Sequence, residues 1–180
     1  SRMLPASAAV AKEALPLVDI PALTHLAREA VNAGVKRIHI ITSPRKDFSN
    51  LIGDNSWLIP KARGIDPKLL SPFDEVEVMI HVQEVPRGFG DALYCALHAI
   101  SGPFLVLLGD NLLMDEHSNS HDYLASNASK TLIKVFDRTG LPCVGLYSVE
   151  DPENYGVVTM EGEKILDIIE KPIREDAPSN

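Results

Sequence analysis

The chain has 180 residues, of which 45% are hydrophobic and 23% charged, which is the composition of a globular protein with a packed core. Its formal net charge is −8 and no basic stripe runs along it, so nucleic acid is not expected as a partner. No run of 18 apolar residues and no signal peptide is recognised, so we expect a cytoplasmic protein with no membrane partner. Cys95 and Cys143 lie in apolar surroundings without metal or disulfide spacing, and both are expected to be buried thiols.

The first half of the chain predicts a helix and a strand after an N-terminal loop. Residues 1–19 mix small residues and prolines, which favours a loop. From Pro21 to Gly34, apolar residues recur at helical spacing between a starting proline and a terminating glycine. Residues 37–42 are apolar and β-branched and predict a strand. Residues 45–72 are hard to interpret, apart from a short helix near residues 47–51.

The second half predicts strands that alternate with helices. Strands are expected at residues 75–83, 104–108 and 143–149, helices at 91–100 and 123–137, and a hairpin at 155–160 and 165–170. Such alternation predicts an α/β fold with a mostly parallel (mixed) central sheet in three layers, formed by a single domain over residues 1–180.

Asp110 is the candidate metal ligand, because it follows the apolar residues 104–108 directly after Gly109. Ligands of open α/β sheets gather at the carboxyl ends of buried strands, where a carboxylate can hold a divalent cation beside a phosphate. The alternative is that Asp110 and Asn111 only form the turn after the strand.

A glycine loop between the strand at 75–83 and the following helix is a candidate nucleotide site. Gly88 and Gly90 let a flat or anionic ligand approach the backbone, and the helix adds the positive end of its dipole. The amide of Gln83 can offer a donor and an acceptor to a nucleobase edge. A tight strand-to-helix turn with no ligand explains the same pattern.

Three further groups of side chains could carry chemistry. Arg2 and Lys12 are cations that could reach phosphate oxygens, although these two residues by themselves favour plain surface solvation. Glu170 and Lys171 end an apolar strand and could bind sugar hydroxyls and a sugar phosphate, although a solvated strand end is the default interpretation. His117 and His121 have the i, i+4 spacing of metal ligands, but the Ser-Asn-Ser between them favours a solvated loop.

Taken in order, these segments resemble the sugar-1-phosphate nucleotidyltransferases, and most closely the bacterial glucose-1-phosphate uridylyltransferase branch (UDP-glucose pyrophosphorylases). The matching segments span the chain and are residues 1–5, 11–19, 33–35, 83–92, 108–110, 155–158, 170–172 and 177–180. The resemblance implies a Rossmann-like α/β/α nucleotidyltransferase fold. It also implies transfer of a nucleotidyl group from UTP to glucose 1-phosphate, which gives UDP-glucose and pyrophosphate with Mg²⁺ as the cofactor.

The resemblance assigns a role to each matching residue. Arg2 and Lys12 would be catalytic and hold the triphosphate, Gln83 and Gly88 would contact the base, and Asp110 would bind Mg²⁺. The sugar and its phosphate would be bound by four residues, namely Tyr155, Gly156, Glu170 and Lys171.

The chain also departs from the family pattern. Ala11 and Ile20 replace a usual proline and lysine, and the family's N-terminal Gly-rich loop and C-terminal part, with its second metal-binding aspartate, are expected outside these residues. A homo-oligomer is expected. Two alternatives remain open, a glucose-1-phosphate thymidylyltransferase that uses dTTP and a non-catalytic regulator that binds nucleotide sugars.

Overall fold

The computed structural model describes residues 3–116 and 119–179. Contacts divide the chain into two compact units, Ser1–Cys143 and Val144–Asn180, and each is considered by itself. None of the helices in the described residues is long and apolar enough to cross a membrane.

The N-terminal residues form short elements where the sequence predicted only a loop. A helical turn, α1 (Ala6–Ala9), is followed by the 3-10 helix η1 (Lys12–Ala14). Strand β1 (Pro16–Leu17) then pairs antiparallel with β2 (Ile20–Pro21). Between these two strands, Val18 has a φ of +61°, a conformation that a β-branched residue rarely adopts.

Helix α2 (Ala22–Asn32) confirms the predicted helix. Pro21 precedes its first turn, and Gly34 follows its last turn with a φ of +90°, a left-handed conformation that glycine adopts without steric cost. Its predicted apolar face is buried at Leu26, Ala27 and Ala30.

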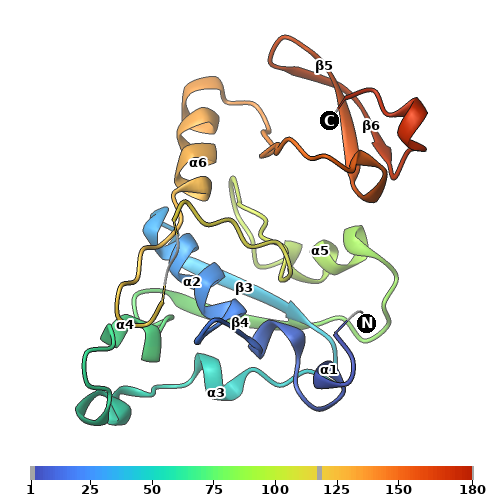
Figure 1. Ribbon diagram of the computed structural model, residues 1–180. Coiled ribbons are helices and arrows are strands. Elements are labelled where there is room, and N and C mark those ends of the chain that lie inside the picture. The colour runs from blue at the N-terminus through green and yellow to red at the C-terminus, as the bar shows by residue number, and fades with distance from the viewer. Residues whose placement is uncertain (1–2, 117–118, 180) are drawn as a thin grey trace. The chain divides into compact units, whose positions relative to one another are not determined.

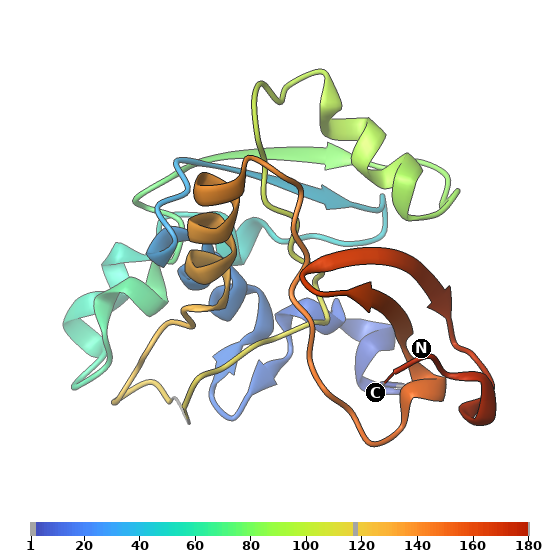
Figure 2. The ribbon, with the colours of Figure 1, turned by 90° about the horizontal axis from the view of Figure 1, so that it is seen from above.

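The core of the first unit forms where α2 covers two parallel strands. Strand β3 (Arg37–Thr42) pairs with β4 (Glu77–Val82) in register along its whole length, as expected for the segments 37–42 and 75–83. Figures 1 and 2 show α2 along this pair. The buried residues that form one cluster here are Ala27, Ile40, Phe48 and Phe73. The carboxyl ends of β3 and β4 therefore reach the same edge of the pair.

The connections around this pair contain helices. Between β3 and β4 lie α3 (Ser49–Ile52), the 3-10 helix η2 (Ser56–Lys61) and α4 (Pro67–Leu70). Helix α5 (Phe89–Leu97) follows β4, contacts both strands and confirms the helix predicted near 91–100.

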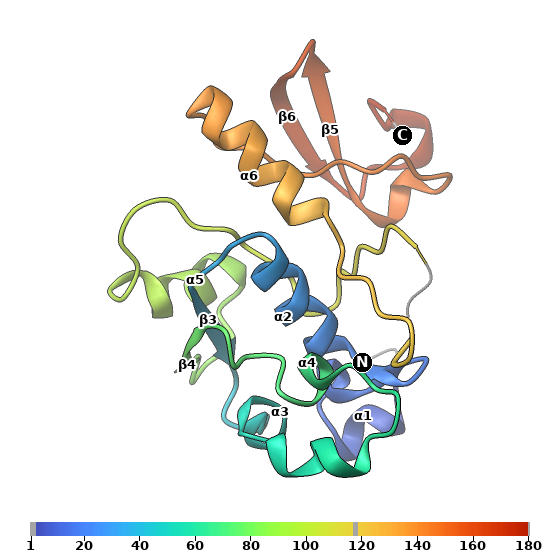
Figure 3. The ribbon, with the colours of Figure 1, turned by 90° about the vertical axis from the view of Figure 1, so that its left-hand side faces the viewer.

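Helix α6 (Ala128–Thr139) begins five residues later than the predicted start at Tyr123. Ser126 explains the later start, because its Oγ accepts from the N–H of Ala128 at 3.1 Å and so satisfies a donor of the first turn. Glu29 of α2 accepts from the Oγ of Ser129 at 2.5 Å, so a buried carboxylate joins the two helices, which lie together in Figure 3.

The strands predicted at residues 104–108 and 143–149 are wrong. Neither segment pairs with another in residues 3–116 and 119–179, and the side chains of Phe104, Val106 and Leu108 are exposed. An apolar run favours a strand but does not ensure one, because a strand also needs a neighbouring backbone to complete its hydrogen bonds. Because residues 143–149 join no sheet within the described part of the chain, Cys143 is exposed, against the expected burial. Cys95 is partly buried on α5. The α/β class is confirmed.

The second unit is built on the predicted hairpin. Strand β5 (Gly156–Glu161) pairs antiparallel with β6 (Lys164–Glu170), with a register shift at Thr159 and Met160. The 3-10 helices η3 (Pro152–Asn154) and η4 (Arg174–Asp176) flank it. Arg174 ties the flanks together, since it donates to the carbonyl of Glu150 at 3.0 Å and lies 3.5 Å from a carboxylate oxygen of Glu153.

Candidate functional site

Lys12 and Asp110 form an ion pair, although 98 positions separate them in the sequence. Lys12 opens η1, and its Nζ donates to Oδ2 of Asp110, which follows the apolar segment 104–108. The hydrogen bond from Lys12 is the main reason that the pKa of Asp110 lies below its ordinary value, while partial burial opposes this shift. Two residues predicted to bind phosphate and metal are therefore brought together.

A small pocket of about 150 Å³ adjoins this pair. Ligand pockets for whole small molecules are several times larger, so this one suits a group the size of a phosphate. A cation and an anion on its wall allow it to hold a phosphate through Lys12 and a metal ion through Asp110. Its lining residues are Met3, Lys12, Leu15, Pro16, Leu17, Ala22, Gly109, Asp110 and Leu112.

A second ion pair, between Glu13 and Lys46, neighbours the Lys12–Asp110 pair. The Oε1 atom of Glu13 lies 2.7 Å from Nζ of Lys46, and the Glu13 side chain is only 10% exposed. Gly109 packs against Glu13, because a Cβ added to Gly109 would lie 3.0 Å from its Cγ. Glu13 directly follows Lys12 in the sequence, and it packs against Gly109, which directly precedes Asp110. Glu13 therefore connects the two segments that carry the Lys12–Asp110 pair.

The predicted base-binding residues Gln83 and Gly88 are also in contact. Gln83 continues the β3–β4 pairing, since its N–H donates to the carbonyl of Thr42 at 2.8 Å. Its side-chain Nε2 donates to the carbonyl of Gly88 at 3.2 Å and to Oδ2 of Asp91 at 2.6 Å. Gly88 has a φ of +105° and a Cβ there would meet nothing within 4 Å, so a flat ligand could approach its backbone.

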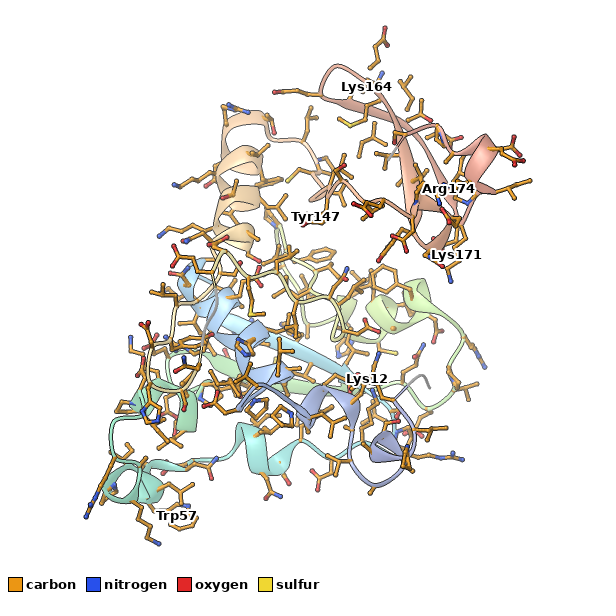
Figure 4. The ribbon with its side chains drawn as sticks, viewed as in Figure 1. Lys12, Trp57, Tyr147, Lys164, Lys171 and Arg174 are labelled. Carbon is orange, nitrogen blue, oxygen red and sulfur yellow. The ribbon has the colours of Figure 1, made fainter. Side chains whose placement is uncertain are left out.

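The four residues expected at the sugar lie together in the second unit. Gly156 faces Glu170 across the β5–β6 hairpin, and the N–H of Lys171 donates to the carbonyl of Tyr155 at 2.8 Å. Lys171 lies just beyond β6 with a φ of +47°, and its Nζ lies 3.9 Å from Oε1 of Glu170. Figure 4 labels Lys12 in the first unit, and Lys171 with the nearby Arg174 in the second. The hairpin end thus presents an acid and a base side by side.

Asp110 is an accessible carboxylate that could act as a metal ligand. Its side chain is 64% exposed, so a hydrated cation can reach it. In the part of the chain that the structure describes, no group of three or more His, Cys, Asp or Glu residues could hold a metal ion. This fits Mg²⁺, which usually takes one or two carboxylates and completes its shell with substrate phosphates and water.

Two of the sequence-predicted residues cannot be placed. Arg2 and His117 lie outside the described residues. The partner proposed for His117 in a metal pair, His121, has its Nδ1 3.1 Å from the carbonyl of Gly64.

Sequence reasoning missed Glu13, Lys46 and Asp91. Each looks like an ordinary surface charge in the sequence, and only Asp91 carried a signal, since a carboxylate in the first turn of a helix beside a glycine loop is well placed to accept hydrogen bonds.

Comparison with known proteins identifies a family over the whole chain. The model of the nucleotidyl transferase family matches residues 1–180. The UTP–glucose-1-phosphate uridylyltransferase YngB of Bacillus subtilis (strain 168) is 34% identical, over 99% of this chain and 62% of the relative. The UTP–glucose-1-phosphate uridylyltransferase of Streptococcus pyogenes is 32% identical, over 100% of this chain and 62% of the relative. The chain therefore spans about 62% of the length of these curated relatives.

Solved structures agree with this family. A crystal structure of apo UDP-glucose pyrophosphorylase matches with a TM-score of 0.80 and 25% identity, over 99% of this chain and 68% of that one. A UTP-bound UGPase from Acinetobacter baumannii matches with a TM-score of 0.78 and 29% identity, over 99% and 66%. A UDP-glucose pyrophosphorylase complexed with UDP-glucose matches with a TM-score of 0.72 and 26% identity, over 99% and 67%.

Proposed function

Because the chain belongs to the nucleotidyl transferase family, we propose that its protein transfers a uridylyl group from UTP to glucose 1-phosphate. The products are UDP-glucose and pyrophosphate. The observation that carries this proposal is the Lys12–Asp110 ion pair on a phosphate-sized pocket. The names of the relatives and the UTP and UDP-glucose of the matching structures support the choice of substrates.

The reaction requires positioning and charge neutralisation more than covalent chemistry. An oxygen of the glucose 1-phosphate phosphate attacks the α-phosphorus of UTP, the bond from that phosphorus to the β-phosphate breaks, and pyrophosphate leaves with its electron pair. The attacking phosphate is already anionic, so no general base is needed. Lys12, with Arg2, neutralises charge on the triphosphate and on the leaving pyrophosphate, the kind of electrostatic stabilisation that dominates such transfers.

Members of this family are generally metal-dependent, and we assign Mg²⁺ to Asp110. When bound, the ion would neutralise phosphate charge next to the reacting phosphorus. Asp110 would hold it, while the neighbouring Lys12 draws the same phosphates towards the pocket. Lys12 and Asp110, which form an ion pair with each other, would thus offer a positive charge to the phosphates and a negative charge to the metal ion.

The remaining residues would orient the two substrates. Gln83 and Gly88 would hold the pyrimidine, whose edge can pair with an amide. In the hairpin unit, Tyr155, Gly156 and Glu170 would face the sugar, and Lys171 would bind the sugar phosphate.

We also propose a three-layer, Rossmann-like arrangement with a mostly parallel central sheet. The TM-score of 0.80 to a UDP-glucose pyrophosphorylase supports it. A single nucleotidyltransferase domain over residues 1–180, a homo-oligomeric assembly and a cytoplasmic location belong to the same proposal.

The test is pyrophosphate release by the full-length protein with glucose 1-phosphate and either UTP or dTTP. We expect UTP to be the better substrate. A clearly faster reaction with dTTP would point to a thymidylyltransferase instead. Thermal stabilisation by UDP-glucose with no pyrophosphate release from either nucleotide would point to a non-catalytic regulator.

A further inference from the structure

The amide group of Gln83 is held in one orientation by two acceptors. Its Nε2 lies 2.6 Å from Oδ2 of Asp91 and 3.2 Å from the carbonyl oxygen of Gly88. A carboxylate and a carbonyl oxygen accept hydrogen bonds and cannot donate them, whereas an amide nitrogen carries two N–H donors. Both donors of Gln83 are thus used inside the protein, and its Oε1 is left as the group that can meet a ligand.

Asp91 is the stronger of the two acceptors and comes from a different element than Gln83. Gln83 directly follows β4, and Asp91 lies in the first turn of α5, eight positions further along the chain. Hydrogen bonds to a charged acceptor are shorter and stronger than those between neutral groups, in keeping with the two distances. If the amide turned over, Oε1 would face two acceptors, which is strongly disfavoured.

We propose that Asp91 is a positioning residue that selects uracil or thymine over cytosine by fixing the amide of Gln83. This inference rests on the proposed function, in which Gln83 contacts the base. Uracil and thymine carry an N–H at ring position 3, which can donate to Oε1. Cytosine has a lone pair at that position, so two acceptors would face each other and the base would be rejected.

The backbone around Gly88 completes the edge that reads the base. Gly88 precedes the first residue of α5, where the N–H groups of the first turn have no partner within the helix. Such donors can meet a carbonyl oxygen of uracil while Oε1 of Gln83 meets its N–H. The backbone N–H at the start of α5 is then the donor to the base, and Oε1 of Gln83 is the acceptor. Asp91 fixes this assignment, because it holds the Nε2 of Gln83 away from the base.

The experiment compares UTP with CTP in Asp91→Ala and Asp91→Asn variants of the full-length protein. We measure kcat/KM for each nucleotide with saturating glucose 1-phosphate. The ratio of UTP to CTP should fall about tenfold in Asp91→Ala, the equivalent of one hydrogen bond, because the amide then keeps only its weaker acceptor, the carbonyl of Gly88, and can turn to donate to cytosine. Asp91→Asn should keep the ratio within about threefold, because its Oδ1 can still accept from Gln83.

An unchanged ratio of UTP to CTP in Asp91→Ala would overturn the proposal, whether kcat/KM stays at the wild-type level for both nucleotides or falls equally for both. An equal fall is the result of a purely structural role. Should Asp91→Ala fail to fold, Asp91→Ser replaces it, since a serine hydroxyl can donate as well as accept and should also relax the ratio.

Failure of the proposed function would be seen separately, as a wild-type protein that releases no pyrophosphate from UTP. In that case calorimetric titration with UMP and CMP measures the same selectivity without turnover. Preference of the wild type for UMP and its loss in Asp91→Ala would support the role of Asp91, and equal affinities of the wild type for UMP and CMP would contradict it.

Discussion

Lys46→Met should lower the free energy of unfolding, because it removes the partner of a nearly buried carboxylate. Lys46 lies 2.7 Å from Oε1 of Glu13, whose side chain is 10% exposed, while that of Lys46 is 35% exposed. The other oxygen of Glu13, Oε2, is buried without a hydrogen-bond partner in the described residues. Lys46 is therefore the partner that offsets the cost of burying the charge of Glu13.

The size of the loss follows from these exposures. Removing one partner of a fully buried ion pair costs about 3–5 kcal/mol, and leaving a single buried polar group unsatisfied costs about 1–3 kcal/mol. Water can reach the Lys46 side chain, which is 35% exposed, so the pair is not fully buried and we expect a loss of about 2 kcal/mol, as for a single unsatisfied buried group. Methionine keeps the aliphatic packing of the lysine stem.

Urea unfolding of the wild type and the variants at neutral pH measures this loss. Lys68→Met is the matched control, because Lys68 lies 3.3 Å from Glu75 with side chains that are 57% and 45% exposed. An exposed pair of this kind contributes about 0–1 kcal/mol. Glu13→Gln combined with Lys46→Met should recover much of the loss. Equal stabilities of the Lys46→Met and Lys68→Met variants would refute the reasoning.

Two further predictions concern stability. Val18→Gly should stabilise the protein by about 0.5–1 kcal/mol in the same urea titration. The exposed Val18 has a φ of +61°, where a side chain costs about 1–2 kcal/mol, and glycine recovers part of that cost. The control Val10→Gly, at an extended position with φ −135°, should give no gain. Burial, and then the charges of His39 and His98, lower the pKa of His81 below 6.5. The unfolded chain therefore binds the proton first as the pH falls, so stability should decline below pH 6.5 and level off below the lowered pKa. His81→Gln should flatten that decline in unfolding measured from pH 8 to 5, and an unchanged slope would contradict the assignment.

The sequence predicted those elements whose signals are local. Pro21 and Gly34 mark the ends of α2, and the apolar spacing between them is enough to predict its buried face. The β5–β6 hairpin likewise follows from two adjacent β-rich segments. The strand expected at 104–108 was wrong, because an apolar run does not specify which backbone it pairs with.

Only part of the candidate site could be predicted from the sequence, for a related reason. Lys12 and Asp110 could be named from motif order, but their ion pair depends on how segments 98 positions apart fold together. Glu13 and Lys46 carry no sequence signal that separates them from solvated charges, since burial decides their role. Asp91 became informative only once its contact with Gln83 was known.

The most direct test of the Lys12–Asp110 site is the turnover of Asp110→Asn in the full-length protein. The substitution keeps the shape of the side chain and removes the charge that would hold Mg²⁺. Because Asp110 is 64% exposed, its pair with Lys12 contributes little to stability, and the unfolding midpoint should stay close to that of the wild type. We expect pyrophosphate release from UTP and glucose 1-phosphate to fall at least about hundredfold, while Asp74→Asn, an exposed carboxylate elsewhere, leaves it unchanged. A folded Asp110→Asn protein with undiminished pyrophosphate release would remove Asp110 from the site.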